Sequence, residues 1–157
     1  MKKAASLLLA LVLALSLALP AYAEETTYAS FEGGVTEIQK YGNLVLDIDP
    51  ADLQEAGYAY GDIVTLAIGE GEYQMPLCTN YSDVDTGSLV LRDSEGVLIA
   101  AINMGDFATT YGIAEKVTAE DGSYTWQFPE GTSLEDVKVT ISMHEKEGYR
   151  DQYLIHQ

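Results

Sequence analysis

The residue types that could act in catalysis lie far apart in this sequence. Cys78 is the only cysteine, and the two histidines, His144 and His156, both lie near the C-terminus. Because an enzymatic nucleophile needs a neighbouring base, this distribution gives little support to a hydrolase triad. No basic residue adjoins Cys78, so we expect a buried, unreactive thiol. Neither histidine has a second ligand at metal-binding spacing, so we expect both to be solvated.

Two carboxylates in an acidic loop are the candidate metal ligands. Asp83 and Asp85 alternate in NYSDVDTGS, just before Gly87, a spacing that can offer oxygen ligands to calcium. The third ligand, the glycine position and the distal Glu of an EF-hand loop are missing. A turn between two strands explains the loop more simply, so we predict no metal site.

An asparagine at the end of an apolar run is the candidate for ligand binding. In GVLIAAINMGD, Asn103 follows a nearly continuous apolar run and comes just before Gly105 and Asp106. Glycine lets backbone approach closely, and an asparagine amide both donates and accepts hydrogen bonds. The amide of Asn103 therefore either faces a ligand or satisfies backbone groups at the end of a strand.

Short strand-like segments must position these residues. Glycines separate VTEIQ, NLVLDI, DIVTLAI, SLVLRD, GVLIAAIN, SYTWQF and DVKVTIS, which have the alternation or the apolar content of strands. Asp49 before Pro50 is typical of a helix start, and Gly57 ends that segment. A second helical turn is expected over 106–110. We predict a mainly β fold, a small antiparallel β-barrel with one or two short helices and an inserted hairpin near 115–133.

The N-terminus has the pattern of a secretory signal peptide. Residues 1–23 place two lysines before a Leu/Ala run and end on Ala-Tyr-Ala, which predicts cleavage after Ala23. We therefore expect a secreted or extracytoplasmic protein with no membrane insertion after cleavage. The remaining chain divides into a flexible lead-in over 24–33, a barrel over 34–143 and an amphipathic tail over 144–157. The tail either frays or begins a further downstream segment.

The chain is strongly acidic, with 25 Asp and Glu against 8 Lys and Arg and a formal net charge of −17. Such a surface repels phosphate backbones and anionic lipid, so we expect neither nucleic acid nor a membrane surface as a partner. Eleven tyrosines leave a surface glycan-binding module as an alternative, although tyrosine is also common on half-buried strands.

Two stretches resemble motifs of one known family. KYGNLVLDI, Lys40 to Ile48, looks like an aromatic-Gly-Asn-Leu motif, and Thr79 to Ile113 is similar to a region that runs from an aromatic residue through Ser-x-Gly to Ala-x-Asn. The family is the S-adenosylmethionine hydroxide adenosyltransferases, which also include the chlorinases and fluorinase. The resemblance covers Val35 to Ile113 and only the C-terminal barrel, since the N-terminal domain of those enzymes has no counterpart here.

The resemblance implies a set of residues that face an adenine-type ligand, S-adenosylmethionine or adenosine. Asn43 matches the asparagine at the adenine edge, and Tyr81 matches the aromatic residue on the purine face. Ser94 matches a serine near the methionyl end, while Asn103 and Met104 match a turn whose backbone approaches the adenine.

In that family the site lies between the N-terminal domain of one subunit and the barrel of its neighbour, so a lone barrel would hold only part of a site. We therefore expect an exported module that binds an adenine-type ligand or a partner domain and catalyses no reaction by itself. Such a module can also form oligomers. One alternative is an S-adenosylmethionine hydrolase completed by another domain. Another is a longer secreted, phosphatase-like multidomain enzyme.

Overall fold

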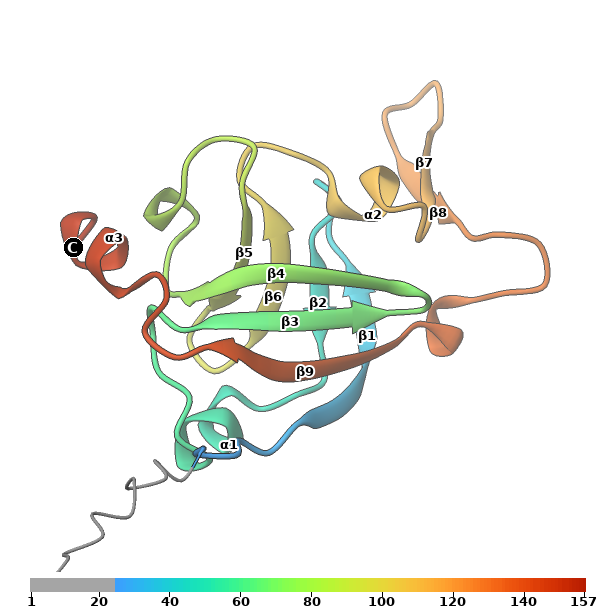
Figure 1. The fold of residues 1–157 in the computed structure, drawn as a ribbon. Helices are drawn as coiled ribbons and strands as arrows, with labels where there is room; N and C mark the ends of the chain where they lie inside the picture. Colours follow the sequence, from blue (N-terminus) through green and yellow to red (C-terminus); the bar gives the residue numbers. More distant parts are fainter. Residues whose placement is uncertain (1–24) are drawn as a thin grey trace, which may run out of the picture.

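The computed structural model describes residues 25–157, which form a closed seven-strand barrel with the order β1-β2-β6-β5-β4-β3-β9 (Figure 1). The barrel strands are β1 (Phe31–Ile38), β2 (Leu44–Leu46), β3 (Ile63–Ile68), β4 (Gly71–Cys78), β5 (Leu89–Asp93), β6 (Leu98–Ile102) and β9 (Lys138–Glu145). The predicted mainly β barrel is confirmed. The predicted signal peptide and its cleavage after Ala23 lie outside the described residues.

One strand pair differs from the predicted antiparallel arrangement. β4 and β5 pair in parallel, with Leu77 opposite Leu91, whereas the other barrel pairs are antiparallel. The chain between these two strands does not turn back as a hairpin but crosses over, through the 3₁₀ turn η1 (Tyr81–Asp83). A parallel pair requires such a longer connection. The barrel is therefore mixed.

The barrel interior is filled by alternate residues of its strands. In β3, Val64, Leu66 and Ile68 are buried while the residues between them are partly exposed, as expected for a strand with one face toward the core. β6 is buried along most of its length, because Ala100 faces the barrel core and Ala101 packs in a second cluster on the outer side. This strand is covered on both faces, which accounts for the nearly continuous apolar run of GVLIAAIN in the sequence.

Both predicted helical segments are present and begin at aspartates. α1 (Pro50–Glu55) starts after Asp49, whose carboxylate accepts a hydrogen bond from the Ala51 N–H. α2 (Phe107–Thr110) starts after Asp106, which accepts from the Thr109 N–H. Side-chain acceptors at this position satisfy backbone donors that have no partner inside the helix. The second cap also fixes the chain just beyond β6.

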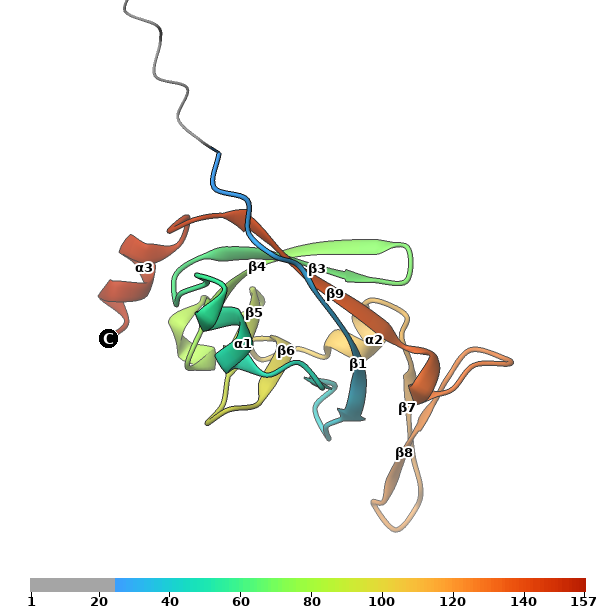
Figure 2. The ribbon, with the colours of Figure 1, turned by 90° about the horizontal axis from the view of Figure 1, so that it is seen from below.

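The inserted hairpin is confirmed as a separate two-stranded sheet, β7 (Glu115–Thr118) and β8 (Tyr124–Gln127). It projects away from the barrel beside α2, as Figures 1 and 2 both show. Lys116 in β7 links the hairpin to the barrel, because the Lys116 ammonium donates to the Lys40 carbonyl over 2.7 Å. This bond places a hairpin residue at the rim of the barrel.

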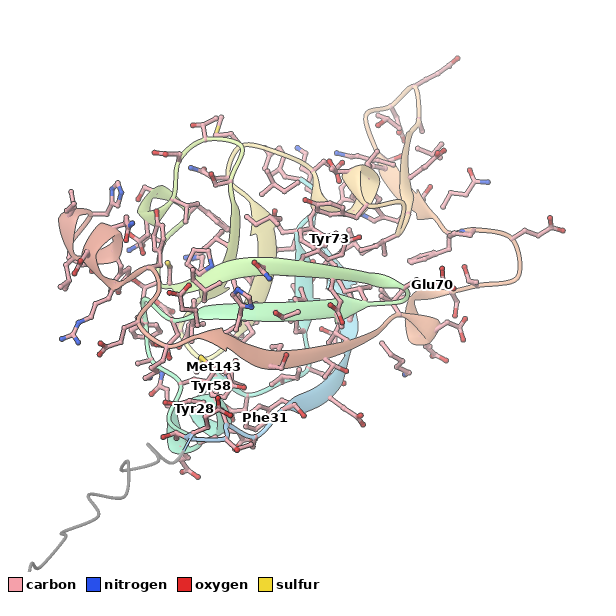
Figure 3. All side chains as sticks on the ribbon, viewed as in Figure 1. Tyr28, Phe31, Tyr58, Glu70, Tyr73 and Met143 are labelled. Atoms are coloured by element: carbon pink, nitrogen blue, oxygen red, sulfur yellow. The ribbon has the colours of Figure 1, made fainter. Side chains whose placement is uncertain are left out.

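The chain before the barrel packs on its surface near α1. The Tyr28 and Phe31 rings each lie 5.9 Å from the Tyr58 ring, and the Tyr58 hydroxyl donates to the Ala29 carbonyl over 2.7 Å. Figure 3 shows these three rings gathered near the start of β1. β1 begins at Phe31, inside the segment 24–33 expected to be a flexible lead-in.

The C-terminal tail folds back onto the barrel. β9 extends to Glu145, and the following turn leads into α3 (Arg150–Ile155). Tyr153 is buried against a cluster that includes Cys78 and Val90, while Leu154 and Ile155 are exposed. Among the helices of residues 25–157, none is long and apolar enough to cross a membrane.

Candidate functional site

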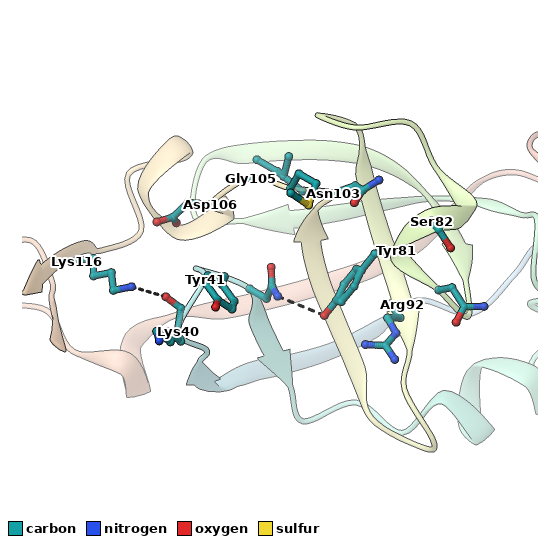
Figure 4. Close-up of a pocket in the computed structure, with 13 residues that line it drawn as sticks. Lys40, Tyr41, Tyr81, Ser82, Arg92, Asn103, Gly105, Asp106 and Lys116 are labelled. Carbon is teal, nitrogen blue, oxygen red and sulfur yellow. Dashed lines mark hydrogen bonds between the residues drawn. The ribbon is translucent and has the colours of Figure 1, made fainter. Parts of the chain in front are cut away.

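A cleft of about 960 Å³ opens beside the ends of β2 and β6 (Figure 4). Its lining comes from the β1–β2 turn, the β4–β5 connection, β5, the segment after β6, and β7. The lining residues are Lys40, Tyr41, Asn43, Asn80, Tyr81, Ser82, Arg92, Ile102, Asn103, Met104, Gly105, Asp106 and Lys116. Segments far apart in the sequence thus meet around one cavity.

Gly42 and Asp106 hold two of these segments together. Gly42 has φ +83°, in the left-handed region that favours glycine, and a Cβ there would collide with the Asp106 carboxylate. The Gly42 carbonyl accepts from the Ala108 N–H over 3.0 Å. The β1–β2 turn therefore packs against the N-terminus of α2, and Asn43 lies in the same cleft as the residues after β6.

The side-chain amide of Asn43 is only weakly engaged by its neighbours. Its Nδ2 donates to the Tyr81 hydroxyl over 3.3 Å and to the Gln39 Oε1 over 3.4 Å, both at the long end of the range for hydrogen bonds. Within residues 25–157, the Asn43 Oδ1 has no hydrogen-bond donor. A ligand with one donor and one acceptor on a flat edge can therefore engage both atoms of this amide.

Tyr81 is held by Arg92 on the same side of the cleft. The Arg92 guanidinium carbon lies 4.6 Å from the centroid of the Tyr81 ring, a cation–π contact. The Arg92 Nε donates to the Thr79 carbonyl over 3.0 Å. Figure 4 shows the Tyr81 ring beside Arg92. Tyr81 is therefore a fixed aromatic surface, as a contact to a purine would require.

Asn103 is firmly bonded within the protein. Its Nδ2 donates to the Val84 carbonyl over 2.8 Å, its backbone N–H donates to the Ser88 carbonyl over 2.9 Å, and its carbonyl accepts from the Gly87 N–H over 2.7 Å. Asn103 thus joins the end of β6 to the acidic loop. Satisfying strand-end backbone groups was one of its two predicted roles.

Met104 and Gly105 form the turn that the sequence suggested. Met104 has φ +61° and its side chain is 86% exposed at the rim of the cleft. A Cβ on Gly105 would come within 2.5 Å of the Ile102 side chain, so only glycine fits there without a shift. Both residues of this turn line the cleft.

Ser94 is the one predicted ligand residue that does not line the cleft. It lies in the β5–β6 turn, where Ser94 and Val97 exchange backbone hydrogen bonds. The pairing of Leu89 with Ile102 and of Asp93 with Leu98 puts this turn at the opposite end of the hairpin from Asn103. Its ligand role stays a prediction.

The two candidate metal ligands do not come together. The buried Asp83 carboxylate accepts from the backbone N–H groups of Thr79 and Asn80, over 3.2 and 2.9 Å, and so caps a turn. Asp85 is exposed. Over residues 25–157, no group of three or more His, Cys, Asp or Glu side chains could hold a metal ion.

The residues considered for catalysis do not form a reactive group. Cys78 is fully buried, and burial, with a smaller contribution from Asp83, raises the pKa of its thiol to about 12. The thiol is thus protonated at neutral pH and a poor nucleophile. His144 and His156 are exposed, as predicted.

Three basic residues at the cleft were not identified from the sequence. Lys40, Arg92 and Lys116 are widely spaced along the chain and join no motif, so they give no local signal. The excess of acids in the composition also pointed away from a basic site. Only the barrel topology and the bond between the Lys116 ammonium and the Lys40 carbonyl bring them to one cavity.

Comparison with known proteins agrees with this fold. Residues 33–120 match the SAM hydroxide adenosyltransferase C-terminal domain. The chain is also similar to a solved structure described as an uncharacterized conserved protein from Thermotoga maritima, with a TM-score of 0.53 and 22% identity over 70% of this chain. That similarity shows the fold alone, and it spans 35% of the other chain. No curated protein matches this chain.

Proposed function

The chain belongs to the SAM hydroxide adenosyltransferase C-terminal domain family, and we propose that its barrel binds an adenine-type ligand in the cleft without catalysing a reaction alone. The observation that supports this most is the weakly engaged amide of Asn43 beside the fixed ring of Tyr81. An adenine edge presents an amino donor next to a ring-nitrogen acceptor. Those groups match the Oδ1 and Nδ2 of Asn43.

The ring of Tyr81 and the open turn at Met104 complete the fit. An aromatic side chain offers a flat apolar surface to a purine, and the backbone after β6 offers additional polar atoms. Asn103 supports the site indirectly, since its own amide is used to hold the Val84 carbonyl. The family relationship suggests adenosine and S-adenosylmethionine as the first adenine compounds to test.

Calorimetric titration of the purified protein with adenosine tests this function. We expect saturable binding, and Asn43→Ala should weaken it about tenfold because two ligand hydrogen bonds are lost. Gln74→Ala is the matched control, because Gln74 is an exposed side chain in β4 outside the cleft. No heat at millimolar adenosine, or equal binding by Asn43→Ala and the parent, would show that this face does not bind the base.

A partner domain is the second candidate occupant of the same face. Tyr41 is 70% exposed and Met104 is 86% exposed, and both lie at the cleft rim, where large apolar side chains favour a protein contact. Such a partner could complete a hydrolase site. Analytical ultracentrifugation of the protein alone, and of a Tyr41→Ser and Met104→Ser double variant, would detect self-association through this face.

We also propose that the protein is exported, on the signal-peptide pattern of residues 1–23. Export would separate the barrel from cytoplasmic S-adenosylmethionine, which favours binding over the family reaction. Expression in a secreting host followed by N-terminal sequencing of the protein in the medium tests this. The expected first residue is Glu24, and retention of an intact N-terminus in the cell would contradict export.

A further inference from the structure

The basic residues of this acidic protein are concentrated at the cleft. With Lys2 and Lys3 set aside, residues 25–157 contain six Lys and Arg, and three of them, Lys40, Arg92 and Lys116, line the cleft. The same residues contain 24 Asp and Glu once Glu24 is set aside, and only Asp106 lines it. An even distribution of charge would give the opposite ratio.

The guanidinium of Arg92 is positioned but not neutralised. Its Nε is bonded to the Thr79 carbonyl and its carbon stacks on Tyr81, which fixes the orientation of the group. Across residues 25–157, its two terminal amino groups have no hydrogen-bond acceptor, and Arg92 makes no ion pair. A guanidinium in this state presents a planar fork that matches the oxygens of a phosphate.

Two ammonium groups, those of Lys40 and Lys116, lie on the Tyr41 side of the cleft, away from Arg92 (Figure 4). Among residues 25–157, the Lys116 ammonium donates only to the Lys40 carbonyl. The Lys40 ammonium lies 5.7 Å from the centre of the Tyr41 ring. Neither pairs with a carboxylate within the described part of the chain. They keep the cleft positive although the whole chain is negative.

The one carboxylate of the cleft does not neutralise these cations. Both oxygens of Asp106 accept hydrogen bonds from Thr109, one from its backbone N–H and one from its hydroxyl, each over 2.9 Å. Its charge is thereby directed to the start of α2. The cleft has three cations against this one anion, so it favours an anionic ligand and disfavours a sulfonium.

We propose that the ligand is a phosphorylated adenine nucleotide, with its phosphate on the terminal amino groups of Arg92; this rests on the proposed function, which places the base at Asn43 and Tyr81. A phosphate ester has about two negative charges at neutral pH. Lys40 and Lys116 add a longer-range attraction, which salt screens.

Calorimetry with AMP, adenosine, S-adenosylmethionine and inorganic phosphate tests this ligand class. We expect AMP to bind about tenfold more tightly than adenosine, as one charge-assisted contact would give, and S-adenosylmethionine to bind most weakly of the three adenine compounds. Arg92→Gln should bring the ratio of AMP affinity to adenosine affinity from about ten to about one. Because Arg92 also holds the Tyr81 ring, the affinity for adenosine should fall as well, so the ratio is the measured quantity. Arg92→Lys retains the positive charge but not the planar guanidinium, so it should keep only part of the affinity advantage of AMP over adenosine.

Lys138→Gln is the matched control, because Lys138 is an exposed cation of β9 outside the cleft. If Arg92→Gln does not fold, as judged by its melting temperature, the exposed Lys40→Gln replaces it, with a smaller expected loss of AMP affinity.

The outcomes separate the two hypotheses. Equal affinities for AMP and adenosine, or tightest binding of S-adenosylmethionine, would overturn the proposal of a nucleotide ligand but would leave the proposal of adenine binding intact. If inorganic phosphate binds as tightly as AMP, the cleft is an anion site that does not use the base, and the proposal of a nucleotide ligand is overturned as well. Absence of adenosine binding would defeat the proposed function itself.

Discussion

Two groups of polar side chains on this barrel have opposite hydrogen-bonding states. The first, which we call the C-terminal clasp, consists of Asp62, Asp83, Lys146, Tyr149 and Tyr153. Asp62 is fully buried, yet its carboxylate accepts from the Glu147 N–H over 2.8 Å, from the Ala59 N–H over 2.7 Å and from the Lys146 ammonium over 2.8 Å. The Tyr149 hydroxyl donates to the Asp83 carbonyl over 3.0 Å.

The second group lines the cleft and has unused hydrogen-bonding capacity. Asn43 holds its neighbours through long bonds, and the terminal amino groups of Arg92 have no acceptor among the described residues. A polar group that is fully satisfied within the protein contributes to folding, whereas one that is fixed but unsatisfied is available to a ligand. This difference supports a structural role for the clasp and the proposed binding role for the cleft.

Of the changes that test this difference, removal of the buried carboxylate in the clasp should have the largest effect on stability. Asp62→Ala should lower the free energy of unfolding by about 3 kcal/mol, because two backbone donors and one ammonium would lose their acceptor. Urea denaturation measures this. Asp85→Ala, at an exposed position of the acidic loop, should change it by less than about 0.5 kcal/mol. A loss below about 1 kcal/mol for Asp62→Ala would contradict a structural role for the clasp.

A smaller effect separates the two asparagines of the cleft. Asn103→Ala leaves the Val84 carbonyl without its 2.8 Å donor and should cost about 1 kcal/mol of stability. Asn43→Ala removes only long bonds and should cost less than about 0.5 kcal/mol, while adenosine affinity falls. Equal losses of stability in the two variants would mean that Asn43 is also a structural residue.

Alkaline pH should gradually lower the free energy of unfolding, through two groups that pack beside the clasp. Burial raises the pKa of Cys78 to about 12 from its ordinary value of 9.0, and burial together with Asp93 raises that of Tyr60 to about 12 from 10.0. Above about pH 9 the unfolded chain loses these protons first, so stability is full below that pH and falls as pH rises toward 12.

Thermal melts between pH 8 and pH 11 measure this dependence. Cys78→Ala should flatten the fall by removing the thiol that ionises in the unfolded chain. A melting temperature that stays constant up to pH 11 in the parent protein would contradict the raised pKa values.

Much of the fold followed from local patterns in the sequence. Asp49 with Pro50 predicted the first short helix, and the Gly112 that ends FATTYG predicted the second, because helix starts and ends depend on local interactions. The parallel pairing of β4 and β5 was not predictable, since the acidic loop between them reads equally well as a hairpin turn. The end of the β5–β6 hairpin at which Ser94 lies depends on strand register, which single residues do not reveal.

The sequence predicted only those residues of the candidate site that lie in stretches resembling the family motifs. Asn43, Tyr81, Asn103 and Met104 belong to stretches that resemble the family, and all four line the cleft. Arg92 and Lys116 contribute through position alone, because β5 and the inserted hairpin approach the same cavity from different parts of the chain. Their proposed role rests on two observations within residues 25–157: the terminal amino groups of Arg92 have no acceptor, and neither residue pairs with a carboxylate. No sequence pattern records either property.

Titration of the ¹⁵N-labelled protein with AMP, followed by amide chemical shifts, tests the central claim most directly. Cleft binding predicts saturable shifts at the amides of Asn43, Tyr81, Arg92 and Met104, with those of Asp62 and Tyr153 in the clasp unchanged. Shifts centred on the clasp, or none at millimolar AMP, would contradict the assignment of binding to the cleft.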